Sequence, residues 1–253
     1  MDNDSKKHGT MIELQEKSFM VQAPQILTQT NFDQIFVASV CGEDIIKQLK
    51  DEFNIAQDKI INPFYQSYYE PLEKFLAKLA QIFAQKDIKG SIAELGVYQG
   101  DTAKRFNKYF PDKSLYLFDT FEGYAKDDIE KGDNVFAKEF GEGHLSNTSK
   151  ELVLSKMPNP QKVIIKQGWF PQTTQGLENK KFCLVNLDPD LYNPVLEGLE
   201  FFYPRLVKNG VLCVAGYFSL HSGVKKAVDE FSEKYKLDFI PLAIGNWVIF
   251  VKT

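Results

Sequence analysis

The sequence predicts an α/β fold whose seven-stranded, mainly parallel and doubly wound sheet closes with an antiparallel hairpin, preceded by a small N-terminal α/β appendage. Two observations predict this fold. From residue 63 to the C-terminus, apolar strand-like runs alternate with amphipathic helical runs, which is typical of a parallel sheet. The last two apolar runs, 238–242 and 247–251, flank a short turn that contains Gly-Asn and is typical of a hairpin.

The first sixty-two residues carry a pattern of their own. Strands over 32–40 and 58–62 flank an amphipathic helix over 42–55, which makes a β-α-β fragment. The preceding segment, DNDSKKHGT, resembles the middle of small Rossmann-like modules, although the first strand and its Gly-rich phosphate-binding turn are absent. We expect a truncated Rossmann-like module over 1–62 that serves packing or a homodimer, and the alternative is an ordinary N-terminal extension.

The main domain is expected over residues 63–253. A helix that starts near Pro71 carries apolar residues at helical spacing and leads into the sheet. Further helices are predicted over 101–109, 193–206 and 222–235. The strands before the hairpin are predicted over 91–97, 114–120, 162–168, 181–188 and 210–218.

Composition and charge exclude several classes of partner. The balance of 30 Lys+Arg against 34 Asp+Glu, without a basic block, gives no electrostatic footprint for nucleic acid or an anionic membrane. No apolar run is long enough to span a membrane, and the N-terminus is polar where a signal peptide would be apolar. We therefore expect a cytoplasmic protein with a small-molecule partner. Its three cysteines lack metal-ligand spacing and are interpreted as structural thiols.

The segment IAELGVYQGDTA (92–103) places glycines between the first main-domain strand and the next helix. Gly96 permits a tight turn, and Gly100 permits close approach of a ligand to the helix N-terminus. The segment lacks the three glycines of a pyrophosphate-binding turn, which counts against NAD. Glu94 is a carboxylate that could pair with an ammonium group of a cofactor.

The ends of the next two strands add to this candidate cofactor site. LFDTFEG (117–123) puts Asp119 where a carboxylate can accept hydrogen bonds from both hydroxyls of a ribose, with a capping role as the alternative. QGWFPQT (167–173) places Gly168 and Trp169 near the expected adenine pocket, although a buried Trp can equally belong to the core.

These motifs, together with LDPDLY (187–192), FYPRL–VKNG and GVKKAVDEF (223–231), occur in the order seen in the macrocin O-methyltransferase family, which the chain resembles over residues 64–253. The resemblance implies a class I S-adenosylmethionine (SAM) methyltransferase fold. It implies SAM as methyl donor and a sugar hydroxyl as acceptor, on a nucleotide-linked or otherwise carried sugar destined for a polysaccharide or a glycosylated metabolite. The competing hypothesis is an NAD-linked oxidoreductase or sugar-nucleotide epimerase.

The resemblance also implies roles for individual residues. Phe121 and Asp188 would join the cofactor site. The residues expected at the sugar are Glu122, Asp190, Tyr192 and Tyr217.

The end of the fifth strand departs from the family pattern. The family looks metal-dependent, with acids from LDxDLY and a pair of aspartates, in VDDY, after the fifth strand. Here Ala215 and Gly216 stand at the positions of that pair. Hard cations such as Mg²⁺ need several oxygen ligands, so this departure argues against a tightly bound divalent metal.

Three interpretations of this edge follow. The enzyme acts without a tightly bound metal, with Asp188 or His221 as general base. Alternatively, other acids such as Glu122 or Asp190 complete an altered metal site. In the third interpretation the chain is a degenerate subunit that binds SAM or sugar without catalysis.

The polar stretch 124–144 lies between the second and third main-domain strands. Most charged runs of this kind are solvated surface. Its position beside the cofactor edge also fits a mobile lid, with Phe136, Phe140 and His144 facing inward.

Overall fold

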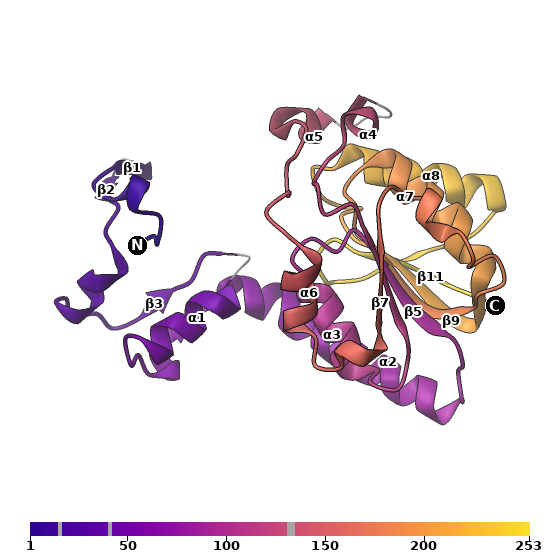
Figure 1. Cartoon of the computed structure of the whole chain (residues 1–253), viewed down its shortest axis with the longest axis horizontal. Coiled ribbons are helices and arrows are strands. Elements are labelled where there is room, and N and C mark those ends of the chain that lie inside the picture. The colour runs from indigo at the N-terminus through magenta and orange to yellow at the C-terminus, as the bar shows by residue number, and fades with distance from the viewer. Residues whose placement is uncertain (15–16, 40–41, 131–134) are drawn as a thin grey trace. The chain divides into compact units, whose positions relative to one another are not determined.

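The structure is a computed structural model that describes the chain apart from residues 15–16, 40–41 and 131–134 (Figure 1). The chain forms two compact units, Met1–Tyr69 and Glu70–Thr253. The division thus falls after Tyr69, whereas the sequence predicts a boundary after Asn62.

The first unit contains the predicted β-α-β fragment. Strand β3 (Ile35–Phe36) pairs in parallel with β4 (Ile60–Ile61), and helix α1 (Gly42–Asp51) connects them. Ile35, Leu49 and Ile60 are buried in a small core of this unit. An antiparallel hairpin of β1 (Met11–Leu14) and β2 (Lys17–Met20) precedes the fragment and was not predicted.

The second unit holds a seven-stranded sheet in the order β10-β11-β9-β8-β5-β6-β7. Neighbouring strands are parallel, except that β11 runs antiparallel to both β9 and β10. This arrangement confirms the predicted sheet and its closing hairpin. The strands are β5 (Ser91–Leu95), β6 (Leu115–Asp119), β7 (Val163–Gln167), β8 (Phe182–Leu187), β9 (Leu206–Val214), β10 (Ile240–Pro241) and β11 (Val248–Val251).

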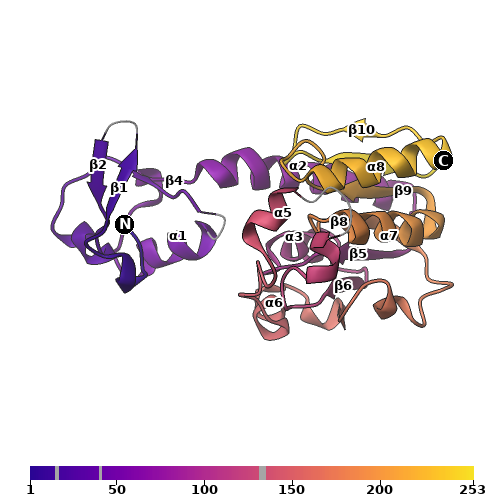
Figure 2. The same cartoon turned by 90° about the horizontal axis from the view of Figure 1, so that it is seen from above.

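Helices cover both faces of this sheet (Figures 1 and 2). Helices α7 and α8 pack against each other on one face, and α2 and α3 pack together on the other, with α6 beside α3. The helices are α2 (Glu70–Gln85), α3 (Asp101–Tyr109), α4 (Lys126–Glu130), α5 (Val135–Phe140), α6 (Lys150–Lys156), α7 (Tyr192–Phe202) and α8 (Ser222–Tyr235). No helix among the described residues is long and apolar enough to cross a membrane.

The central strands are apolar along their whole length because both of their faces are covered. Every residue of β8 is buried, and its side chains on one face pack against Leu199 and Phe202 of α7. Gly198 allows α7 to approach closely, since a Cβ there would lie 2.9 Å from the side chain of Leu187. Cys183 is buried as predicted, and burial raises the pKa of its thiol to about 11. Cys41 lies outside the described residues.

Strand β9 differs from the predicted strand 210–218. It begins earlier, at Leu206, and ends at Val214. Gly216 has a φ of +81°, which does not continue a strand, so the chain turns immediately after Val214. The turn starts the connection to α8 and places residues 215–221 at the edge of the sheet.

The order of the strands creates the position for a site. β5 lies between β6 and β8. From β5 the chain continues through β6 and β7 toward one edge of the sheet, and it then crosses back to β8 and β9 on the other side of β5. In open α/β sheets, ligands bind at this switch point, outside the carboxyl ends of the strands.

Candidate active site

A cavity opens at the carboxyl ends of β5, β6, β7 and β8. Four carboxylates line it, from Asp119, Asp128, Asp188 and Asp190, together with apolar side chains such as Phe170. The described lining contains no Lys or Arg. Such a lining suits a ligand that carries positive charge and an apolar ring.

The turn after β5 depends on Gly96. Its φ is +83°, and a Cβ at this position would lie 2.4 Å from the carbonyl oxygen of Asp188. Glycine therefore lets the ends of β5 and β8 meet at the cavity. Gly100 also has a positive φ, but a Cβ there would meet Val153 of the α6 segment at 3.0 Å. Gly100 does not line the cavity, and its role in the structure is close packing of α3 against α6.

Asp119 ends β6 and lines the cavity. Its carboxylate accepts the backbone N–H groups of Val97 at 2.7 Å, Tyr98 at 2.9 Å and Phe121 at 2.7 Å. A carboxylate can accept about four hydrogen bonds, so this arrangement leaves room for about one more instead of the expected pair of ribose hydroxyls. Asp119 thus also ties the β5 turn to the end of β6.

Glu94 is buried in β5 and does not line the cavity. The Nδ2 of Asn186, on the neighbouring strand, donates to its Oε1 at 2.9 Å, while its Oε2 has no hydrogen-bond partner among the described residues. Burial raises the pKa of Glu94 to about 8. Sequence reasoning missed Asn186, although an Asn inside the apolar run FCLVNL could have signalled it.

Asp188 and Asp190 lie together at the end of β8 and both line the cavity. Burial, followed by the charges of Asp190 and Glu94, raises the pKa of Asp188 well above its usual range. Asp190 accepts a hydrogen bond from the hydroxyl of Tyr124 at 3.0 Å, and its Oδ1 lies 3.6 Å from Nε2 of His221. Burial raises the pKa of Asp190, and His221 opposes that shift.

Ala215 and Gly216 follow β9 beside this cluster. A Cβ on Gly216 would lie 3.9 Å from Oδ1 of Asp190, so a carboxylate at that position would reach Asp190. Glycine supplies no such ligand. Within the described parts of the chain, no group of three or more His, Cys, Asp or Glu side chains is arranged to hold a metal ion.

Gly168 and Trp169, which follow β7, line the cavity. Five other predicted site residues lie outside its lining: Phe121, Glu122, Tyr192, Tyr217 and His221. The hydroxyls of both tyrosines donate to acidic side chains of α8, Tyr192 to Glu230 and Tyr217 to Asp229. Glu122 is exposed to solvent, so it does not join Asp188 and Asp190 as a third acid.

Sequence reasoning missed several cavity residues, among them Tyr98, Tyr124 and Leu145. Tyr124 and Leu145 come from the long connection between β6 and β7 in which the lid was expected. In that connection Phe140 is exposed and stacks on His144 at 4.2 Å between ring centroids, and His144 contacts the ring of Tyr124. The side chain of Phe136 lies outside the described residues.

Comparison with known proteins supports this fold. The solved O-methyltransferase NovP aligns with a TM-score of 0.61 and 19% identity over 72% of this chain and 80% of its own. The calicheamicin methyltransferase CalS11 aligns with a TM-score of 0.58 and 16% identity over 90% of this chain and 88% of its own. At these identities the two structures support the fold. No curated protein matches the chain significantly.

The family model described as macrocin O-methyltransferase matches residues 69–252, which is the whole sheet-bearing unit apart from its last residue. The chain therefore belongs to the macrocin O-methyltransferase family and is a SAM-dependent O-methyltransferase.

Proposed function

We propose that this enzyme transfers a methyl group from SAM to a hydroxyl of a sugar held on a nucleotide or another carrier. The family supports the sugar, and one relative of similar fold, CalS11, is described as a TDP-rhamnose 3′-O-methyltransferase. The observation that carries the proposal is the cavity at the β5–β8 switch point, where Asp188 and Asp190 meet the turn of Gly96. Because its described lining offers no cation for a diphosphate, the carrier would extend beyond the cavity.

The residues present fit SAM. SAM supplies a methyl group on a positively charged sulfonium, and it also carries an ammonium and an adenosine. The carboxylates of the lining would offset those positive charges, and the unpartnered Oε2 of Glu94 would gain from a cation nearby. Asp119 would accept from a ribose hydroxyl, and Trp169 and Phe170 would contact the adenine.

Asp188 or His221 would remove the proton from the acceptor hydroxyl, without a tightly bound metal. Asp188 lines the cavity, and the high pKa that burial gives it makes its ionised form a stronger base. His221 would instead act beside Asp190, whose Oδ1 lies 3.6 Å from its Nε2. Both candidates lie beside the same cavity edge, so the choice between them is experimental.

The test is an assay with labelled SAM and a panel of nucleotide-linked hexoses and heptoses, with and without a chelator, in which mass spectrometry detects methylated product. Product that forms equally with chelator supports the metal-independent proposal. Product that chelator abolishes and a divalent ion restores overturns the metal-independent part. SAM binding with no product from any acceptor favours the binding-subunit interpretation instead.

Substitution separates the two bases. We expect the variant of the true base, Asp188→Asn or His221→Gln, to lower kcat at saturating SAM about 10²-fold or more, because base catalysis contributes about that much. The exposed Glu122→Gln is the control. Unchanged kcat in both Asp188→Asn and His221→Gln would contradict the proposal.

A further inference from the structure

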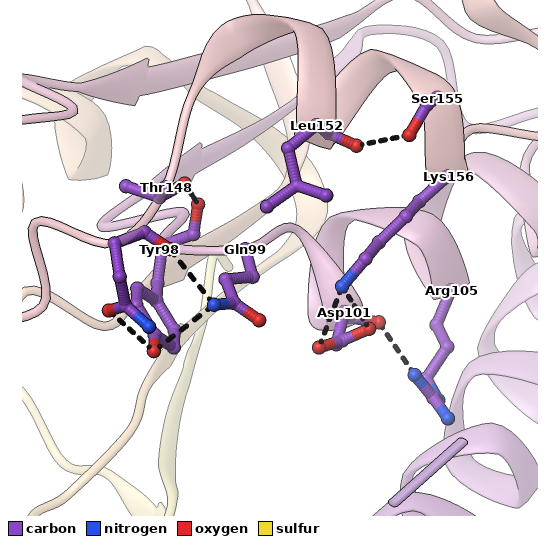
Figure 3. Close-up of polar contacts among 9 residues, drawn as sticks. Tyr98, Gln99, Asp101, Arg105, Thr148, Leu152, Ser155 and Lys156 are labelled. Carbon is purple, nitrogen blue, oxygen red and sulfur yellow. Dashed lines mark hydrogen bonds and ion pairs between the residues drawn. The ribbon is translucent and has the colours of Figure 1, made fainter. Parts of the chain in front are cut away.

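A segment far along the chain is bonded to the turn that follows β5. Figure 3 shows Tyr98 and Gln99 of this turn against Thr148. The hydroxyl of Thr148 donates to the carbonyl oxygen of Tyr98, and the hydroxyl of Tyr98 donates to Oδ1 of Asn147 at 2.9 Å. Nε2 of Gln99 donates to the carbonyl oxygen of Asn147 at 2.9 Å. We call residues 143–148 the clasp.

Tyr98 needs such support. Its φ is +48°, in the left-handed region that residues other than glycine rarely adopt. Its backbone N–H donates to Asp119, and the residue lines the cavity. A disfavoured backbone persists only where its surroundings hold it, and such residues gather at ligand sites.

The clasp is itself fixed at both ends. At its start, the N–H of Gly143 donates to the carbonyl oxygen of Tyr124 at 2.9 Å, and the N–H of Tyr124 donates to that of His144 at 2.9 Å. At its end, Ser149 caps α6 by accepting the N–H of Leu152 at 3.1 Å. The clasp can therefore impose a position on Tyr98.

Helix α6 is in turn bonded to α3, the helix that follows the β5 turn. Nζ of Lys156 lies 3.2 Å from Oδ1 of Asp101, and both side chains are mostly buried (Figure 3). Asn107 and Asn159 exchange hydrogen bonds, with the N–H of Asn159 donating to Oδ1 of Asn107 at 2.6 Å. The β5 turn and the clasp thus belong to one bonded assembly.

We propose that Asn147 and Thr148 are positioning residues for the cofactor, which hold Tyr98 in its binding conformation before SAM arrives. This inference rests on the proposed function, since it assumes that SAM occupies the cavity beside Tyr98. A site that is ordered in advance loses less conformational entropy on binding, so its affinity is higher. Loss of the clasp bonds releases Tyr98 and weakens SAM binding without touching the carboxylates of the cavity.

The test measures the Kd of SAM by calorimetry on the full chain. We expect Tyr98→Phe and Asn147→Ala each to raise the Kd about 3- to 10-fold, which is the range for one hydrogen bond. The double variant should be no weaker than either single one, because both remove the same bond. Thr148→Val should raise the Kd similarly, and Thr148→Ser, which keeps the hydroxyl, should restore it.

Ser155→Ala is the matched control. Its hydroxyl donates to the carbonyl oxygen of Leu152 at 2.7 Å in the same helix, away from the turn (Figure 3), and we expect an unchanged Kd. In an activity assay with a working acceptor, the clasp variants should raise the KM for SAM by a larger factor than they lower kcat. Kd values within twofold of the natural chain for Asn147→Ala and Thr148→Val overturn the inference. A natural chain that does not bind SAM instead overturns the proposed function.

Discussion

At the scale of single residues, Glu94 shows how burial changes the pKa of a carboxyl group. The pKa of its carboxyl rises from 4.5 to about 8 because β5 buries it, and the hydrogen bond from Asn186 offsets only part of this effect. Folding therefore favours the protonated form. The contribution of Glu94 to stability is complete below about pH 4.5 and is lost as the pH rises through about 8.

Glu94→Gln tests this titration, since glutamine resembles the protonated acid. We expect the variant to gain free energy of unfolding relative to the natural chain between about pH 5 and pH 9, on the order of a few kcal/mol. Urea unfolding without SAM at both pH values measures the difference. The exposed Glu122→Gln should follow the natural chain at both values. A difference between Glu94→Gln and the natural chain that is independent of pH would contradict the assignment.

Gly96 and Gly176 separate a steric requirement from backbone strain. Both have a φ near +80°, but a Cβ on Gly96 would meet the Asp188 backbone at 2.4 Å, while a Cβ on Gly176 would meet nothing within 4 Å. Gly176→Ala should lower the free energy of unfolding by about 1–2 kcal/mol, which is the cost of the left-handed conformation alone. Gly96→Ala should lower the free energy of unfolding by more than about 3 kcal/mol and abolish SAM binding. Equal losses in thermal unfolding would show that the β5 and β8 ends can separate.

The cavity residues that the sequence predicts are those fixed by strand ends. Gly96, Asp119 and Asp188 follow parallel strands, whose carboxyl ends must meet at one edge of the sheet. Tyr192 and Tyr217 follow the same edge in sequence, yet their hydroxyls bind α8. Their direction depends on how α8 packs, which no local pattern encodes.

At the scale of elements, the packing of α2 on α3 depends on one carboxylate. Glu73 of α2 lies 3.3 Å from Nε of Arg105, and it also accepts the hydroxyl of Tyr109 at 3.0 Å. The Arg105 side chain is only 1% exposed, so its charge would be costly without an anion.

We expect Glu73→Ala to lower the free energy of unfolding by about 3 kcal/mol, because it leaves a buried cation without that carboxylate. The control is Glu70→Ala on the same helix. Glu70 pairs with Lys74 at 2.7 Å on an exposed surface, and its loss should change stability by less than about 1 kcal/mol. Chemical unfolding measures both. A loss for Glu73→Ala no larger than that for Glu70→Ala would show that the pair contributes little.

The periodicity of apolar residues predicts whether a segment is a helix or a strand. Where an element ends depends instead on residues with an unusual backbone conformation. The sheet strands and the long helices α2, α7 and α8 were predicted because covered strands are apolar throughout and helices bury one face. The end of β9 was misplaced because Gly216 turns a chain whose apolar letters continue to Phe218. The hairpin of β1 and β2 gave no signal, since its described side chains are exposed on both faces. The clasp could not be predicted, because it joins residues about fifty positions apart.

At the scale of the whole molecule, the candidate cofactor site belongs to one of the two units. Every described residue that lines the cavity belongs to Glu70–Thr253, and the family match covers the same region. Met1–Tyr69 has its own small core around Ile35 and Ile60. The truncated Rossmann-like module expected in the first unit has no role in binding the cofactor. We therefore expect SAM to leave the stability of that unit unchanged.

Hydrogen exchange of the full chain, with and without saturating SAM, tests this division. A ligand that binds only the folded second unit stabilises it by mass action, so exchange should slow about 100-fold when SAM is near 100 times its Kd. The slowing should include β5 and β8 and the amides of Val97, Tyr98 and Phe121 that Asp119 binds. Exchange in β3 and β4 should stay within about twofold, because these strands belong to a separate core. Equal slowing there would mean that the two units open together and that the first unit contributes to the stability of the cofactor site.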